Sequence, residues 1–283
     1  MMKDNLNPAV AFVGCGNMGE ALLSGILKGG FTVPEQVTVS TGTPARRIGL
    51  AEHYGVIPSE SNAACAEGAD LIILAVKPVF YEAVIAEICM HLKEGALLLS
   101  ITPPFTLEKL RSLAERDDIT VARSMPNLGA SLGLGITAIV EDAELSGENR
   151  ELLRRFAESV GTAVFVREDQ LAGMSSLIGS SPAYLAMVLD ALAQGAIELG
   201  IPASESHPLA AQAMLATATL ILQSGEHPAA LRDRVCSAGG TSIAGVTRLE
   251  EGFKGDLIDA MLRSAVRFSE LEKEASADRE HNL

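Results

Sequence analysis

The feature that most restricts the fold of this chain is a glycine-rich segment near its start, GCGNMG at residues 14–19. It directly follows an apolar run at residues 9–13 and precedes a stretch of helical composition at residues 20–28. A GxGxxG motif between a strand and a helix is typical of dinucleotide-binding folds, where the helix N-terminus faces the pyrophosphate and the glycines permit a tight turn and close packing. The residues predicted to contact the cofactor here are Gly14, Gly16, Asn17, Met18 and Gly19.

Strand-like and helical segments alternate from this motif to about residue 166. Residues 70–76, DLIILAV, form a continuous apolar run, as expected for a strand buried on both faces of a parallel sheet. Beyond residue 166, segments rich in Ala and Leu show helical spacing at 170–199, 205–224 and 255–273. The sequence therefore predicts an α/β fold: a Rossmann-type, doubly wound, mostly parallel sheet at residues 1–166, followed by an all-helical C-terminal domain at residues 167–283.

The end of the second predicted strand indicates which dinucleotide binds. NAD sites usually place a carboxylate about 20 residues after the glycines to hold the ribose hydroxyls. This chain instead has Ser40, Thr41 and Thr43, followed by Arg46 and Arg47. Hydroxyl and guanidinium groups suit a 2′-phosphate, so we predict binding of NADP(H) through Ser40, Thr41 and Arg46, with NAD(H) used at lower efficiency. For at least one of the two arginines, a place on a solvated helix face is the alternative.

Composition argues against several other classes of function. The net charge is −14 and the pI about 4.8, which disfavours binding to nucleic acid or to an anionic membrane surface. The four cysteines lie far apart with no CxxC pair, and no histidine stands at metal-ligand spacing, so no metal site is predicted. Because no targeting or membrane-spanning segment is recognised, we expect a cytoplasmic protein with free thiols.

A second glycine-rich segment, CSAGGTSI at residues 236–243, interrupts the helical half. Two glycines end one element, and Thr241 or Ser242 begins the next helix. Successive N–H groups at a helix N-terminus bind carboxylate or phosphate, and the hydroxyls of Ser237, Thr241 and Ser242 stand beside them. A Gly-Gly hinge followed by an ordinary Ser/Thr helix cap explains the same residues equally well, so both interpretations stay open.

Taken in order, the motifs resemble those of the pyrroline-5-carboxylate reductase family over essentially the whole chain. GCGNMG resembles the family's GxGxMG, and an Asn followed by AVKP at residues 75–78 resembles the stretch that lines its cofactor site. RSMPN at residues 123–127 resembles the family's RxMPN segment, and SPAY at residues 181–184 resembles the end of its SGxGPAY segment. The second glycine loop resembles the family's PGGTT…LE signature. The further cofactor contacts that the resemblance implies are Asn62, Ala75, Val76, Lys77, Pro78, Met125, Pro126 and Asn127.

The resemblance implies a reaction: transfer of a hydride from NADPH to the imine carbon of 1-pyrroline-5-carboxylate, which gives L-proline in the last step of proline biosynthesis. By the same resemblance, Ser237 and the backbone N–H groups around Gly239, Gly240 and Thr241 hold the ring carboxylate. Ser242 stands where the family commonly has a Thr whose hydroxyl contacts the ring nitrogen. Thr241 and Ser242 are therefore implied as catalytic residues, with a hydroxyl that orients the substrate or relays a proton through water.

Four departures from the family pattern cluster near the expected pocket. The chain has Ala238 where the family usually has Pro, Leu128-Gly129 for Thr-Pro, Ile178 for a small polar residue, and Thr102-Pro103 for a small Ala/Gly turn. The alternatives are a paralogue that reduces another cyclic imine and a nucleotide-binding regulatory protein with little turnover. Enzymes of the β-hydroxyacid dehydrogenase class resemble one another around a catalytic Lys on the first long helix of the second domain. Residues 170–199, the corresponding helix here, contain no Lys, so that class is disfavoured.

The helical half has few charges for its length, notably at residues 183–199 and 209–222. Such Ala-rich helices indicate faces buried against a second subunit. In the resembled family these helices interleave to form a dimer, and dimers often assemble further. We therefore expect a homodimer at least and a small-molecule substrate, with no nucleic-acid or membrane partner.

Overall fold

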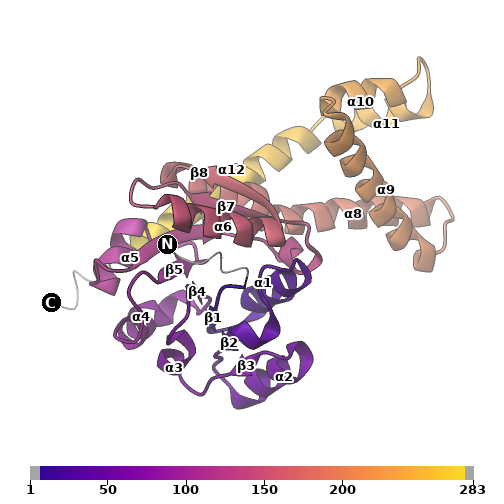
Figure 1. The fold of residues 1–283 in the computed structure, drawn as a ribbon. Helices are drawn as coiled ribbons and strands as arrows, with labels where there is room; N and C mark the ends of the chain where they lie inside the picture. The colour runs from indigo at the N-terminus through magenta and orange to yellow at the C-terminus, as the bar shows by residue number, and fades with distance from the viewer. Residues whose placement is uncertain (1–6, 278–283) are drawn as a thin grey trace. The chain divides into compact units, whose positions relative to one another are not determined.

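The computed structural model describes residues 7–277, in which eight strands form one sheet (Figure 1). The strand order is β3-β2-β1-β4-β5-β6-β7-β8, so the direction of winding reverses between β1 and β4. Neighbouring strands are parallel except β6 and β7, which are antiparallel. The strands are β1 (Val10–Val13), β2 (Val37–Val39), β3 (Ile57–Pro58), β4 (Leu71–Leu74), β5 (Leu97–Ser100), β6 (Thr120–Met125), β7 (Gly135–Val140) and β8 (Gly161–Val166).

The central strand β4 shows why helices cover both faces of the sheet. Its four residues are all buried, and they alternate between two hydrophobic clusters. One cluster joins the sheet to α3, α4 and α5, and the other joins it to α1, α2 and α6. The doubly wound sheet predicted from the apolar run is thereby confirmed. These helices are α1 (Asn17–Lys28), α2 (Pro44–Tyr54), α3 (Asn62–Ala66), α4 (Tyr81–Cys89), α5 (Leu107–Ala114) and α6 (Gly147–Ser159).

Two details of the sheet do not follow from the sequence pattern. Strand β3 has only two residues, both exposed, so no apolar periodicity identifies it. Strand β7 runs antiparallel to β6 because only a short connection containing the 3-10 turn η3 (Leu128–Leu132) joins them, and a parallel pair needs a longer crossover. Helix α6 supplies such a crossover between β7 and β8, which are parallel.

The division into compact units differs from the predicted boundary at residue 166. The first unit contains the described residues up to Gly179 and those from Ala265 onward, whereas the second is Ser180–Ser264. The chain stays with the first unit after β8 because Leu171 is buried in its core, and the last helix returns there with Phe268 buried. The elements concerned are η4 (Glu168–Gln170), α7 (Leu171–Met174), a π-helical segment (Ser175–Ser180) and the second half of α12 (Phe253–Ala277).

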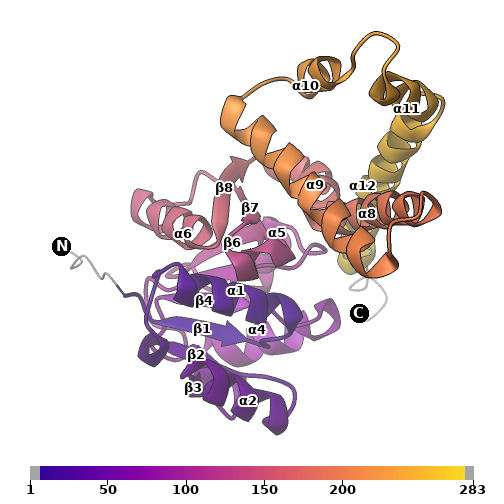
Figure 2. The same cartoon turned by 90° about the vertical axis from the view of Figure 1, so that its right-hand side faces the viewer.

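The second unit is entirely helical, as predicted for this part of the chain. Helices α8 and α9 pack against each other, and α9 is the long orange helix in Figure 2. Large apolar side chains stay exposed on both, among them Met187 at 74% and Leu222 at 84% exposure. The helices of this unit are α8 (Ser181–Glu198), α9 (Ala203–Ser224), α10 (Pro228–Val235), α11 (Thr241–Leu249) and the first half of α12.

One helical stretch among residues 7–277, Glu168–Glu198, is long and apolar enough to cross a membrane by length and composition alone. Its mean hydropathy reaches 1.3, and 17% of the most apolar window is buried. Apolar side chains exposed along such a stretch are normally buried against another apolar phase, either lipid or a second protein surface.

Candidate functional site

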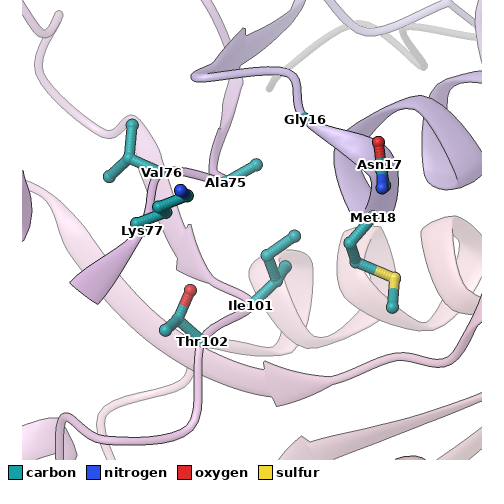
Figure 3. A pocket seen from close by; sticks show the side chains of 8 residues that line it. All are labelled: Gly16, Asn17, Met18, Ala75, Val76, Lys77, Ile101 and Thr102. Atoms are coloured by element: carbon teal, nitrogen blue, oxygen red, sulfur yellow. The ribbon is translucent and has the colours of Figure 1, made fainter.

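A cavity of about 380 Å³ opens at the carboxyl ends of β1, β4 and β5 (Figure 3). The switch in winding direction falls between β1 and β4, and open α/β sheets bind their ligands at such a point. Six of the lining residues were predicted from motifs, whereas Ile101 and Thr102, which follow β5, complete the wall. Thr102 was expected near the pocket, but Ile101 was not predicted. Its position directly after a strand beside the switch point is the signal that could have identified it as a lining residue. The lining residues are Gly16, Asn17, Met18, Ala75, Val76, Lys77, Ile101 and Thr102.

The glycine loop fits a dinucleotide pyrophosphate. Gly14 has a φ of +79°, and a Cβ built on it would lie 2.2 Å from Val76 Cγ1, so only glycine is tolerated in this turn. Gly16 is the N-cap of α1 and provides no side-chain cap, which leaves the first N–H groups of the helix available. A Cβ on Gly16 would meet protein only at 3.8 Å, at the Gly14 carbonyl oxygen, so the space beside it is open. An uncapped helix N-terminus beside open space is a phosphate cradle.

Ser40 and Asn62 lie behind this turn and hold it. The Gly14 N–H donates to Ser40 Oγ at 3.2 Å, and Ser40 Oγ donates to Asn62 Oδ1 at 2.8 Å. Asn62 Nδ2 in turn donates to Glu87 Oε2 at 2.8 Å. Ser40 is almost fully buried, so its contribution is to fix the turn rather than to present a hydroxyl at the surface. Glu87, on α4, was not predicted because nothing near it in the sequence marks it as a partner of the loop.

Arg46, which was predicted to contact a 2′-phosphate, reaches the glycine loop and is already engaged there by other groups. Its Nε donates to the Cys15 carbonyl oxygen at 2.9 Å, and its Nη2 contacts Glu20 Oε2 at 2.8 Å. Thr41 Oγ1 donates to the Thr43 carbonyl oxygen at 2.7 Å and so closes the turn that leads to α2. Glu20 was not predicted, because the expected position for a carboxylate is the end of β2 and this one comes from the first turn of α1.

The RSMPN segment holds the fold beside the cavity rather than lining it. Asn127 Nδ2 donates to the Ile178 carbonyl oxygen at 3.0 Å, and Asn127 Oδ1 accepts from the Ile136 N–H at 3.1 Å. The side chain thus links the end of β6 both to β7 and to the π-helical segment. Met125 lies against that segment too, since a Cβ on Gly179 would approach Met125 Cε to 2.8 Å. Ten of the sixteen predicted cofactor contacts are not among the cavity-lining residues: Gly14, Gly19, Ser40, Thr41, Arg46, Asn62, Pro78, Met125, Pro126 and Asn127.

Arg123 is the largest fully buried side chain of the described residues, and charged groups surround it. Its Nη1 contacts Glu168 Oε1 at 2.8 Å, and its Nη2 contacts Glu272 on α12 and the carbonyl oxygen of Pro103. The guanidinium carbon lies 5.7 Å from the centre of the Phe268 ring. Pro103 directly follows the cavity residue Thr102, so Arg123 ties the loop after β5 to the last helix.

The second glycine loop, in the second unit, is the candidate substrate site. Gly239 has a φ of +68°, and the Gly240 N–H donates to the Ser237 carbonyl oxygen at 3.0 Å. A Cβ on Gly240 would lie 2.3 Å from Ser237 Oγ, so a side chain there would have to displace the Ser237 hydroxyl. Gly240 is the N-cap of α11 and no side chain caps the helix, which removes the interpretation of an ordinary Ser/Thr cap. Thr241 is exposed and Ser242 half-buried, so the loop with its free N–H groups is open to a ligand.

Comparison with known proteins identifies the relatives of this chain. A pyrroline-5-carboxylate reductase from Escherichia coli (strain K12) is 36% identical over 266 residues, which cover 93% of this chain and 98% of the relative. The chain belongs to the pyrroline-5-carboxylate reductase family. Residues 168–271 match the family described as pyrroline-5-carboxylate reductase dimerisation, and residues 9–104 match that of NADP oxidoreductase, coenzyme F420-dependent. The family and the reductase function predicted from the motifs are confirmed.

Solved structures of the family share this fold. The pyrroline-5-carboxylate reductase of Coxiella burnetii matches with a TM-score of 0.85 and 27% identity, over 94% of this chain and 98% of that one. The pyrroline carboxylate reductase of Plasmodium falciparum, solved with NADP bound, matches with a TM-score of 0.85 and 22% identity, over 94% of this chain and 99% of that one. The two-part arrangement of a Rossmann-type sheet and a mostly helical C-terminal region is therefore the family's fold.

Proposed function

We propose that the chain transfers a hydride from NADPH to the imine carbon of 1-pyrroline-5-carboxylate and so forms L-proline, as the last step of proline biosynthesis. The observation that carries this proposal is that one chain of family length holds both an uncapped phosphate cradle and an uncapped glycine loop. The cradle suits a dinucleotide, and the loop suits a carboxylate.

The cofactor-binding part of the proposal assigns roles along the cavity. NADPH, when bound, supplies the hydride. The N–H groups of Asn17 and Met18 at the start of α1 hold the pyrophosphate. Arg46 lies beside the loop, and its contact with the 2′-phosphate makes NADP(H) the preferred cofactor over NAD(H). Ala75, Val76 and Lys77 line the cavity with Ile101 and Thr102, at the carboxyl ends of the strands where the cofactor would bind. The Plasmodium structure was solved with NADP bound.

The substrate-binding part rests on the second glycine loop. Backbone N–H groups at Gly239 and Thr241, with the Ser237 hydroxyl, hold the ring carboxylate, while the Gly240 N–H, which donates to the Ser237 carbonyl oxygen, keeps the loop in shape. The hydroxyls of Thr241 and Ser242 orient the ring nitrogen and relay a proton to it through water. A hydroxyl is too weak an acid to protonate an amine by itself, so its contribution is positional.

A direct assay tests this function. Purified protein should oxidise NADPH in the presence of 1-pyrroline-5-carboxylate, and Ser242→Ala and Thr241→Val should each lower kcat about tenfold to a hundredfold. Thr247→Val is the matched control, because Thr247 Oγ1 only donates to the Ile243 carbonyl oxygen within the same exposed helix. Turnover only with a six-membered cyclic imine would favour the paralogue, and tight NADPH binding without any turnover would favour the regulatory alternative.

We further propose that the chain works as a homodimer in the cytoplasm. The family region named for dimerisation covers residues 168–271, and the exposed apolar side chains of α8 and α9 lie within it. Close packing of two such surfaces supplies the cover that these side chains need. In this proposal the stretch Glu168–Glu198 packs on protein rather than lipid.

Sedimentation at micromolar concentration without detergent should give at least twice the chain mass of 29.6 kDa. Met187→Asp, which places a charge on an exposed apolar position, should shift the distribution towards monomer, whereas Glu158→Gln on α6 should not. A monomeric wild-type chain, or one that stays in solution only with detergent, would contradict the proposed dimer.

A further inference from the structure

A carboxylate occupies the place where the 2′-phosphate of NADP(H) is expected to meet its arginine. Glu20 Oε2 lies 2.8 Å from Arg46 Nη2, and the two side chains are 37% and 36% exposed. The Tyr54 hydroxyl donates to the other oxygen of Glu20 at 3.3 Å. Arg46 and Tyr54, the last residue of α2, both donate to Glu20. They fix its carboxylate at the edge of the glycine loop.

The charges of Arg46 and Glu20 nearly cancel each other. Arg46 is held by Glu20 and by the Cys15 carbonyl oxygen, so little of its positive charge is left uncompensated. Burial above all, and then the neighbouring Glu20 carboxylate, raises the pKa of Tyr54, which stays a neutral donor. Burial raises the pKa of Cys15 to about 12, so its thiol is neutral as well. Arg47, the next residue on α2, is the other cation of this region.

These charges act unequally on the two dinucleotides. A phosphate monoester carries about −1.5 to −2 charges at pH 7, and it is repelled by a carboxylate that it meets next to its arginine. NAD(H) lacks that phosphate, so the same carboxylate has little effect on its binding. The Glu20 carboxylate thus acts mainly on the difference between the two affinities, which is the definition of a specificity determinant.

We propose that Glu20 is a specificity-determining residue that restrains the preference of the chain for NADP(H) over NAD(H). The proposal rests on the assignment of this loop as the dinucleotide site under the proposed function. Glu20 does so through its charge, while its hydrogen bonds keep Arg46 in place. The variant Glu20→Gln distinguishes the effect of the charge from that of the hydrogen bonds. Its amide oxygen still accepts a hydrogen bond from Arg46 or Tyr54 but carries no charge.

The test compares dissociation constants of NADP⁺ and NAD⁺, measured by calorimetry, for the wild type, Glu20→Gln and Glu158→Gln. Glu158 is matched in net charge, since it is an exposed carboxylate 3.7 Å from Arg154 on α6. Glu20→Gln should bind NADP⁺ about threefold to tenfold more tightly and NAD⁺ within about twofold of the wild type. The gain should shrink when the salt is raised from about 0.05 M to about 0.5 M, because the groups are half-exposed.

Unchanged or weaker NADP⁺ binding in Glu20→Gln, or an equal gain for both dinucleotides, would overturn the proposal. An equal gain in Glu158→Gln would overturn it too, since net charge alone would then explain the effect. Binding is measured without turnover, so a chain that shows the predicted shift but does not reduce 1-pyrroline-5-carboxylate contradicts only the proposed function. A wild type that binds neither dinucleotide contradicts both.

Discussion

Arg123→Met should destabilise the protein by about 3 kcal/mol, which corresponds to a fall in Tm of about 6–12 °C for a chain of this size. Methionine matches the aliphatic part of the arginine side chain but has no guanidinium to pair with Glu168 and Glu272 or to donate to the Pro103 carbonyl oxygen. The two carboxylates are 34% and 23% exposed, so water partly compensates them and the loss stays at the lower end of the range for buried pairs. The affinity for NADPH should fall as well, because the loop after β5 lines the cavity.

Denaturant unfolding followed by circular dichroism measures this change, with all variants at one protomer concentration because an oligomer's stability depends on it. Arg167→Met is the matched control: Arg167 makes a two-bond contact with Asp169, but both side chains are about 70% exposed. The expected loss there is below about 1 kcal/mol. Equal losses in the two variants would show that burial of Arg123 contributes nothing of its own.

Gly14→Ala should weaken NADPH binding by at least about a hundredfold and also lower the stability by about 3 kcal/mol. An alanine at a φ of +79° is strained, and its Cβ would lie 2.2 Å from Val76 Cγ1 and 3.0 Å from Val76 Cα. Val76 is β-branched and cannot rotate its methyl groups away cheaply, so the backbone of the cavity wall has to move.

Gly16→Ala provides the contrast within the same loop. A Cβ there meets protein only at 3.8 Å, so the fold should keep its Tm within about 2 °C. Cofactor affinity should still fall about tenfold or more, because the second glycine of the motif permits the approach of the pyrophosphate. Thermal unfolding and fluorescence titration with NADPH measure both effects. Equal changes in Tm for the two variants would contradict the separate roles assigned to the two glycines.

Much of the nucleotide site follows from local sequence. The strand-glycine-helix order around residues 14–19 and the apolar run of β4 are local patterns, and both specify the sheet edge that carries the cavity. Motif resemblance added Ala75, Val76 and Lys77, which line that cavity. It also added Asn127, whose side chain forms a hydrogen-bonded link between β7 and the π-helical segment. A motif therefore identifies a residue as part of the region without stating whether it contacts the ligand or holds the region in shape.

The sequence by itself determined the fold class, the cofactor loop and the helical character of the second unit, because each depends on contacts between near neighbours and on periodic burial. Only the tertiary structure decided which charges meet. Arg46 and Glu20 are 26 residues apart, and Arg123 and Glu272 are 149 residues apart. No local pattern records such pairs, since their geometry exists only after the sheet has formed and the last helix has packed on it. The electrostatics beside the glycine loop and the anchoring of the cavity wall are for that reason properties of the folded chain.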